Sequence, residues 1–347
     1  MIINHNISAL NTYRQLSLNN SNAAKSIEKL SSGYRINRAG DDAAGLAISE
    51  KMRAQIRGLN MASKNAQDGI SLIQTAEGAL NETHEILQRM RELAVQSAND
   101  TNTDFDRESL QKEVDQLAQE LSRIGATTEF NTKKILDGTF TGRLHIGANA
   151  DQNLEISIGD MRGFALGMVG KTVVEGTGTL IVENKGLQAG EYTIKKVGNN
   201  NYELQDSNGN TIATSADGQK FTSIEDGETE LLTLSTAITG DEKVTVGGID
   251  ISSQTAANDA ITAINNAINK VSTERAKLGA YQNRLEHTIN NLGTSAENLT
   301  AAESRIRDVD MAKEMMEYTK NSILQQAAQA MLAQANQMPQ GVLQLLR

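Results

Sequence analysis

The sequence predicts a mainly α-helical protein whose two ends pair as long helices in coiled-coil or bundle packing, with a small β-rich domain inserted between them. Three observations lead to this fold class. Apolar residues in both flanks recur with the heptad spacing of packed helices. Glycine is concentrated in the middle, where 15 of the 28 residues lie between Gly159 and Gly248. The same region contains short runs of β-branched and aromatic residues, which favour strands.

The longest apolar stripe lies near the C-terminus, over residues 257–306. It repeats in steps of four and three residues, and only three of its fifteen positions are polar. Fifty helical residues extend about 75 Å, which is longer than a compact small domain needs, so we expect a rod that packs along other rods. The stripe consists of Ala257, Ile261, Ile264, Ile268, Val271, Arg275, Leu278, Gln282, Leu285, Ile289, Leu292, Ala296, Leu299, Glu303 and Ile306.

The N-terminal flank predicts two further rods, over residues 43–98 and 104–125. Asp41 and Asp42 precede the first rod as candidate caps, and the polar segment Asn99–Asp104 is expected to form a loop that ends in a helix cap. Front and back rods then bury their stripes against one another. The front stripes consist of Ile56, Leu59, Ala66, Ile70, Ile73, Leu80, Leu87, Leu110, Val114, Leu117, Leu121 and Ile124.

The middle of the chain predicts a small acidic β-rich domain. Residues 144–146 and 154–158 flank the turn-forming segment Asn149–Asn153 and indicate a hairpin. Residues 159–250 contain 14 acidic and 7 basic side chains, so they hold −7 of the chain's net charge of −10. The other expected elements are strands at 172–174, 179–182, 191–197, 201–204 and 243–246 and a tight turn at Ser207–Asn210.

Weaker helices are expected at both outer ends. Ile3, Ile7 and Leu10 share one face at the front, whereas the back has only a thin apolar stripe among Asn, Gln and Ser residues. Such helices are marginal on their own, and we expect them to fold when a partner supplies the missing surface. The back stripe consists of Val309, Ala312, Met316, Ile323, Ala327 and Ala330.

These patterns divide the chain into three domains. Residues 1–40 plus 307–347 form a terminal helical assembly domain, and residues 41–165 plus 255–306 form a helical core domain with a hairpin. Residues 166–254 form a variable, acidic, β-rich exposed domain. The boundaries follow the change from heptad to strand patterns.

Composition argues against several classes of function. A net charge of −10 disfavours nucleic acid or an anionic membrane as the main partner, and no apolar stretch is long enough to insert into a membrane. The N-terminus lacks the basic start and apolar core of a secretory signal peptide. The absence of cysteine excludes disulfides, thiolate metal sites and cysteine nucleophiles.

No segment has the pattern of an active site. His84–Gln88 begins like a zinc-protease motif but lacks its second histidine, and the four histidines are scattered. Gly176–Gly178 is too short for a phosphate-binding loop, so we expect a turn there. We therefore expect no catalysis, no cofactor and no metal.

Short strings in both flanks occur in a specific order. The front set is Ile7–Asn11, Lys29–Gly33, Ala39–Ile48, Asn65–Ile70 and Gln88–Ser97. The back set is Ala302–Asp310, Ala333–Asn336 and Val342–Arg347. Together, at these ends of the chain, they resemble bacterial flagellin, the subunit of the flagellar filament. Residues 165–250 resemble no known family, which is expected of a region in which flagellins vary.

The resemblance implies a structural role. In flagellins the outer termini pair as helices that line the central channel of the filament, the heptad rods form the next shell, and the variable middle faces the medium. The implied partners are other copies of the chain in a helical homopolymer, the flagellin export chaperone, the flagellar secretion apparatus, the filament cap and the hook-junction proteins. The protein is then secreted and extracellular and serves swimming motility.

The resemblance also implies candidate sites. Arg89, Leu93 and Glu113 match the patch through which many flagellins are bound by Toll-like receptor 5, and the same residues would serve filament packing. In some flagellins, hydroxyls of the variable region carry O-linked sugars, for which Thr211, Thr214 and Ser215 are candidates. The candidate surface for the chaperone and for assembly consists of Met311, Met315, Met316, Ile323 and Leu332.

Two alternative functions remain open to test. The hook–filament junction protein has similar ends but forms only a short adaptor zone, and the density of flagellin strings argues against it. A secreted enzyme displayed on a helical stem would need a catalytic constellation in residues 159–250, and the sequence shows none there. Abundance in sheared surface material tests the first alternative, and an activity assay of the middle tests the second.

Overall fold

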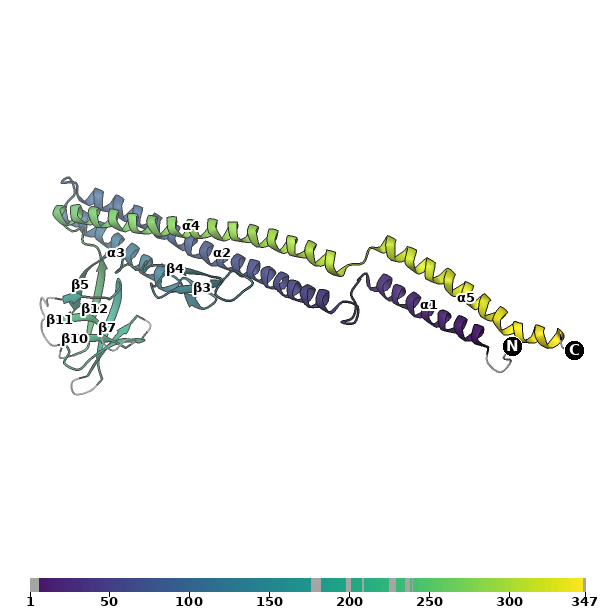
Figure 1. Ribbon diagram of the computed structural model, residues 1–347. Coiled ribbons are helices and arrows are strands. Elements are labelled where there is room, and N and C mark those ends of the chain that lie inside the picture. The colour runs from purple at the N-terminus through teal and green to yellow at the C-terminus, as the bar shows by residue number, and fades with distance from the viewer. Residues whose placement is uncertain are drawn as a thin grey trace. The chain divides into compact units, whose positions relative to one another are not determined.

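The computed structural model describes residues 6–175, 182–197, 201–207, 209–224, 229–234, 238 and 240–345, without the side chains of 171, 175, 182, 183 and 338–345 (Figure 1). The chain divides into two compact units, which are described separately. The terminal unit comprises residues 1–63, 147–152 and 290–347, and the central unit comprises residues 64–146 and 153–289. The mainly α-helical fold class with a β-rich middle is confirmed. The three-domain division stays a prediction.

The three predicted rods are present as α2 (Ala43–Ser97), α3 (Asp104–Thr127) and α4 (Gln254–Arg307). Asp42 caps α2, since its Oδ1 accepts a hydrogen bond from Gly45 N at 2.8 Å. The cap of α3 is Thr103, one residue before the expected end of the loop. It forms a capping box with Asp106, in which each side chain bonds to the other residue's backbone.

The predicted stripes form the helical core. Every predicted stripe residue of α2, α3 and α4 is buried or half-buried. In the central unit, Leu80, Leu121 and Leu278 are fully buried and belong to one cluster with Ile156 and Ile158. Fully burying such a side chain contributes about 1.5–3 kcal/mol, so the heptad residues are a main source of stability.

Two small hairpins follow α3 in the central part of the chain. The first turns through Asn131 and Thr132, which both have positive φ. The second is the predicted hairpin, in which Leu144 pairs with Leu154 in antiparallel register. A Cβ on Gly69 of α2 would lie 2.3 Å from Leu144 Cδ1, so glycine permits this close approach. The strands are β1 (Glu129–Phe130), β2 (Lys133–Lys134), β3 (Thr141–His145) and β4 (Asn153–Ser157).

The middle of the chain folds as an eight-stranded antiparallel sheet in the order β5-β12-β7-β8-β9-β10-β11-β6. Its edge strands β5 and β6 contact each other, so the sheet curls around a second core that includes Phe221, Ile194 and Leu204. The strands are β5 (Val169–Glu175), β6 (Val182–Asn184), β7 (Gly190–Lys196), β8 (Tyr202–Asp206), β9 (Thr211–Ser215), β10 (Lys220–Ser223), β11 (Glu230–Leu234) and β12 (Glu242–Gly248).

Four of the five strands predicted in the middle lie in this sheet, in β5, β7, β8 and β12. Residues 179–181 of the fifth, and Asn208 of the predicted turn, lie outside the described residues. The sequence patterns do not predict β9, β10 and β11. These strands have only four or five residues and few β-branched apolar side chains, so their propensity signal is weak.

In the terminal unit, α1 (Ile7–Ser32) and α5 (Met311–Leu345) lie side by side (Figure 1). Asn6 caps α1 by accepting a hydrogen bond from Ala9 N at 3.0 Å. Gly33 ends α1 with a φ of 75°, the left-handed conformation that glycine adopts without strain. The outer segments are therefore helical as predicted, whereas their folding on assembly stays a prediction. Among the described residues, no helix is long and apolar enough to cross a membrane.

Candidate assembly surface and recognition sites

The contact between α1 and α5 is made largely by small and polar side chains. Lys29 Nζ lies 3.9 Å from the carboxylate of Glu314, and Asn6 Nδ2 donates a hydrogen bond to Ala335 O at 2.7 Å. Because few large apolar side chains are covered, the pairing removes little apolar surface from water. Among the side chains described on the two helices, the buried ones are Ala23, Ser26, Glu314, Ala328 and Ala335.

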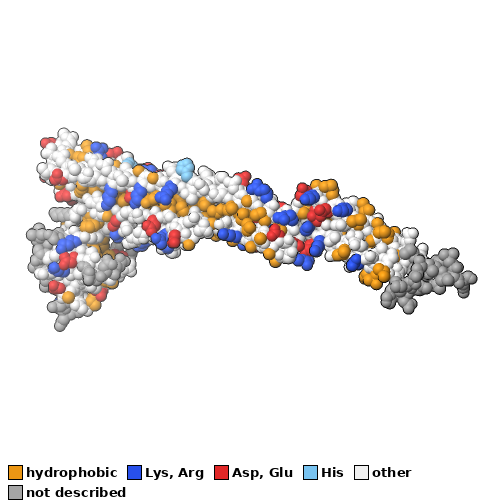
Figure 2. All heavy atoms as spheres, viewed as in Figure 1, with side chains coloured by type: hydrophobic (Ala, Val, Ile, Leu, Met, Phe, Trp, Pro, Cys, Tyr) orange, Lys and Arg blue, Asp and Glu red, His pale blue; other side chains and the backbone are white. Residues whose placement is uncertain are grey.

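Most of the large apolar side chains that the structure describes on α1 and α5 are exposed. Ile323 is nine residues from both Glu314 and Leu332, which is about two and a half helical turns, so it lies on the side of α5 away from α1. Met316, about two turns before Ile323, shares that side. Figure 2 shows apolar side chains (orange) on the surface of both helices. The exposed ones are Ile7, Leu10, Tyr13, Leu18 and Ile27 on α1 and Met311, Met315, Met316, Ile323, Leu324 and Met331 on α5.

The structure separates the five residues of the candidate chaperone and assembly surface. Met311, Met315, Met316 and Ile323 are between 49% and 67% exposed. Leu332 is half-buried on the side that faces α1. The first four residues are therefore accessible to a partner, whereas Leu332 supports the helix pair.

Backbone hydrogen bonds and one cation–ring contact hold together the linkers that join α1 to α2 and α4 to α5. Arg35 N donates a hydrogen bond to Arg307 O at 2.7 Å, and Val309 N donates one to Gly33 O at 3.0 Å. The guanidinium of Arg307 lies over the Tyr34 ring, 4.9 Å from its centroid. The linkers are thus paired over a few residues, as in a short antiparallel ladder.

The candidate receptor patch is only partly on the surface. Arg89 of α2 and Glu113 of α3 form an exposed ion pair with an Nη2–Oε1 distance of 2.8 Å, and Arg89 also lies 3.1 Å from Glu92. These hydrogen bonds, above all the one to Glu113, raise the pKa of Arg89. Leu93 is 1% exposed and packs in the helical core. Leu93 is therefore not a surface contact in the folded chain, and its part in receptor recognition stays a prediction.

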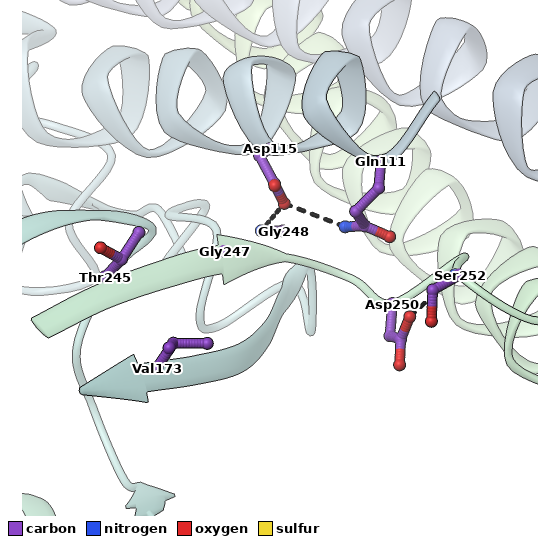
Figure 3. Close-up of a pocket in the computed structure, with 8 residues that line it drawn as sticks. All are labelled: Gln111, Asp115, Val173, Thr245, Gly247, Gly248, Asp250 and Ser252. Atoms are coloured by element: carbon purple, nitrogen blue, oxygen red, sulfur yellow. Dashed lines mark hydrogen bonds between the residues drawn. The ribbon is translucent and has the colours of Figure 1, made fainter. Parts of the chain in front are cut away.

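The root of the sheet is the place where β12 ends at Gly248 and the chain meets α3. It is a polar site that the sequence patterns do not predict (Figure 3). One carboxylate oxygen of Asp115, on α3, accepts hydrogen bonds from Gly248 N at 2.7 Å and from Gln111 Nε2 at 2.9 Å. Gln111 also donates to Ile249 O at 3.1 Å, and its Oε1 accepts from Ile251 N at 2.7 Å. This network fixes the chain to α3 where it leaves the sheet.

A cavity of about 270 Å³ adjoins this root. Asp115 and Gln111 line this cavity and form hydrogen bonds to the neighbouring backbone, so these two side chains position the sheet. Ser97 Oγ strengthens the same region by donating to Ile251 O at 2.6 Å. The cavity is lined by Gln111, Asp115, Val173, Thr245, Gly247, Gly248, Asp250 and Ser252.

The remaining sequence candidates are dispersed. His84 bonds to Gln88, and His145 bonds to Asn153, at 2.9 and 2.8 Å. Within the described part of the chain, no three His, Cys, Asp or Glu residues are grouped to hold a metal ion. His5 and Gly176–Gly178 lie outside the described residues.

The three candidate sugar sites differ in exposure. Thr214 is exposed and Thr211 is half-buried. Ser215 is buried, and its Oγ accepts a hydrogen bond from Gly218 N at 3.0 Å. Ser215 is therefore not accessible as an attachment site in the folded sheet, whereas Thr214 is.

Comparison with known proteins decides the family. The family described as bacterial flagellin N-terminal helical region matches residues 3–141, and bacterial flagellin C-terminal helical region matches residues 261–346, together more than half of the chain. The chain belongs to the bacterial flagellin family. The residues between the two matches contain the whole eight-stranded sheet.

Full-length relatives agree with this assignment. The flagellin of Clostridium tyrobutyricum is 50% identical, covering 98% of this chain and 100% of its own. The flagellin of Bacillus subtilis (strain 168) is 51% identical and covers 100% of both chains. The crystal structure of Bacillus cereus flagellin is 25% identical and covers 69% of this chain and 94% of its own. The TM-score between the two structures is 0.38.

This flagellin is a structural subunit of the bacterial flagellar filament, the organelle of swimming motility. The assignment follows from the family matches at both flanks and from the sequence identity to flagellins over the full chain. The alternative, a hook–filament junction protein, is less supported because the full-length relatives at about 50% identity are flagellins.

Proposed function

We propose that this flagellin polymerises by packing the exposed apolar sides of α1 and α5 against neighbouring copies. The observation that carries the proposal is the exposure of Met316 and Ile323 on the side of α5 away from α1. A neighbour that covers this side contributes about 25 cal/mol per Å² of apolar area. Repeated along a helical polymer that does not close, many weak contacts give a stable filament.

Folding of the outer helices is coupled to this assembly. The α1–α5 contact covers mostly small and polar side chains, and helices of this composition are marginal alone. The pair therefore gains much of its stability only when neighbours cover its apolar sides. In this proposal residues 1–40 plus 307–347 switch the free subunit into the filament, whereas residues 166–254 stay exposed.

Truncation tests this mechanism. Deleting residues 1–30 or 320–347 is expected to leave a soluble, folded chain that does not polymerise, as measured by sedimentation and electron microscopy. A finer comparison uses Ile323→Ser, which removes exposed apolar surface, and Gln326→Ser, which changes an exposed polar residue of the same helix. Filaments of the truncated chains, or equal polymerisation of the two variants, would contradict the proposal.

Before assembly, the same side of α5 serves as the docking surface of the flagellin export chaperone. Met311, Met315 and Met316 have flexible thioether side chains, which suit surfaces that bind different partners in turn. The subunit then passes through the flagellar secretion apparatus to the outside of the cell, where the filament extends from hook-junction proteins to the filament cap. A chaperone that binds here should block polymerisation and bind Ile323→Ser more weakly than the native chain.

Toll-like receptor 5 is the proposed external partner of the exposed Arg89–Glu113 pair. Both charged groups lie at the surface and reach from neighbouring helices, so they can be contacted together. Leu93 supports this site from the core by holding α2 in place. Receptor binding by Arg89→Ala and Leu93→Ala variants separates direct contact from support.

The proposed role is structural and not catalytic, since flagellins are a structural protein family. A hydrolase assay on the full chain tests this, and turnover that is lost on substitution in the sheet would contradict it. Abundance in sheared surface material tests the filament role, because a junction protein would be scarce there.

A further inference from the structure

Methionine is the most oxidisable sulfur residue of this chain, because the sequence contains no cysteine. Among the side chains that the structure describes, four exposed methionines lie on the single helix α5, and the other exposed one is Met61 on α2. Three methionines of the central unit, Met90, Met161 and Met168, are buried and provide an internal comparison. The four on α5 are Met311, Met315, Met316 and Met331, which are 49%, 50%, 67% and 55% exposed.

We propose that these four methionines form a modification site for peroxides, and that their conversion to sulfoxides prevents the free subunit from polymerising. The inference rests on the proposed assembly through the exposed side of α5. Met311 and Met315 are four residues apart and therefore neighbours on the helix surface. Met316 shares the side of Ile323, and Met331 lies fifteen residues further along the same helix.

The chemistry needs only the peroxide as co-reactant. A lone pair of the thioether sulfur attacks one peroxide oxygen, the O–O bond breaks and an S–O bond forms. The sulfur is oxidised by two electrons, and hydrogen peroxide is reduced to water. Reversal uses two thiols, which become a disulfide while the oxygen leaves as water.

Oxidation changes the character of the surface rather than its size. A sulfoxide places a polar oxygen where α5 presents flexible apolar side chains, and burying that oxygen without a hydrogen-bond partner is unfavourable. A neighbour that packs on Met316 and Ile323 would therefore bind the oxidised chain less well. In the filament the same neighbour shields the sulfur, so the site is open in the free subunit and closed after assembly.

Peroxide treatment of the free chain and of preformed filaments, followed by peptide mass spectrometry, tests the site. In the free chain the four α5 methionines are expected to oxidise at least tenfold faster than Met90, Met161 and Met168. In filaments they are expected to be protected at least tenfold. Oxidised free chain is expected to lose at least nine-tenths of its sedimentable polymer with an unchanged circular dichroism spectrum. Treatment with methionine sulfoxide reductase and thiol is expected to restore polymerisation.

Leucine variants distinguish the effect of oxidising the α5 methionines from the effect of oxidising other methionines. A chain with leucine at all four α5 positions is expected to polymerise and to resist peroxide, because leucine has a similar volume and is not oxidised. The matched control Met61→Leu is expected to remain sensitive. Normal polymerisation of a chain whose α5 methionines are shown to be sulfoxides would overturn the inference, as would failure of the reductase to restore it. Neither result touches the assembly proposal, which fails instead if the unoxidised Ile323→Ser chain polymerises normally.

Discussion

The guanidinium of Arg307, the last residue of α4, forms an ion pair with the carboxylate of Glu50 on α2, at an Nη1–Oε1 distance of 2.6 Å. The Arg307 side chain is only 13% exposed and also covers the Tyr34 ring. Its carbonyl oxygen accepts the hydrogen bond of Arg35 N. A single residue therefore ties both linkers to α2, at the point where the α1–α5 pair begins.

Replacing Arg307 by Ala is expected to loosen both linkers. The variant loses the ion pair with Glu50 and the contact with Tyr34, so the backbone hydrogen bonds of Arg35 and Val309 should open more often. Hydrogen exchange of these two amides is expected to become several-fold faster. The control Arg305→Ala removes an exposed arginine of the same turn and should leave the exchange unchanged. Equal exchange in both variants would show that Arg307 does not hold the linkers.

The same ion pair makes linker order sensitive to acid. The hydrogen bond from Arg307 is the main cause that lowers the pKa of Glu50 below its ordinary value of 4.5. Because the folded-state pKa is the lower one, the stabilisation is fully present above pH 4.5 and is lost as the pH falls through the lowered pKa. The protection of the linker amides, measured as the ratio of intrinsic to observed exchange rate along an acid titration, should therefore fall in the native chain. This ratio should change less in Glu50→Gln over the same range.

Replacing Leu93 and replacing Arg89 are expected to have different effects on the stability of the chain and on receptor binding. Leu93→Ala creates a cavity in the core and should destabilise the chain by about 2–5 kcal/mol. Arg89→Ala removes one partner of an exposed ion pair and should leave the stability nearly unchanged. Urea unfolding measures both values. If the receptor proposal holds, Arg89→Ala weakens receptor binding at nearly native stability. A large loss of stability in Arg89→Ala would instead assign that residue to packing.

The helical part of the fold could be predicted because its apolar residues recur at a regular spacing within each segment. Leu121 and Leu278 occupy heptad positions, and the structure buries both. Leu93 shows the limit of matching a short string, since the string carries no information on burial. The spacing of Leu80 and Leu87 continues to Ala94, whereas Leu93 is one residue short of that position, so the stripe alone does not predict its burial.

The root of the sheet could not be predicted because its contacts are not local. Asp115 and Gly248 are separated by 133 residues, and only the completed sheet brings them together. The pairing of Arg307 with Glu50 spans 257 residues and likewise has no signal in either segment alone. The exposure of Met316 and Ile323 was not foreseeable either, since the stripe itself does not show which side of α5 faces α1.

Gly248 is expected to be intolerant of a side chain. A Cβ at this position would lie 2.9 Å from Val114 O and 3.0 Å from Ala118 Cβ on α3, so the backbone of the root would have to shift. Gly248→Ala should destabilise the chain by about 1–3 kcal/mol. Gly279 of α4 has no neighbouring atom within 4 Å of such a Cβ, so Gly279→Ala should stabilise by about 1 kcal/mol. Urea unfolding that shows the same sign for both would contradict this reading of the root.

Glu230 is expected to make the sheet sensitive to acid. Its carboxylate lies 2.7 Å from Lys185 Nζ and 2.9 Å from Lys220 Nζ, and these lysines lower its pKa to about 2. The stabilisation is therefore complete above the ordinary value of 4.5 and disappears as the pH falls towards about 2. Thermal unfolding at decreasing pH should show a falling Tm in the native chain. The Tm of Glu230→Gln should be lower at neutral pH and should fall less as the pH decreases. The control Asp217→Asn, at an exposed position of the same sheet region, should have the Tm values of the native chain. An equally steep loss in Glu230→Gln would assign the acid sensitivity to other carboxylates.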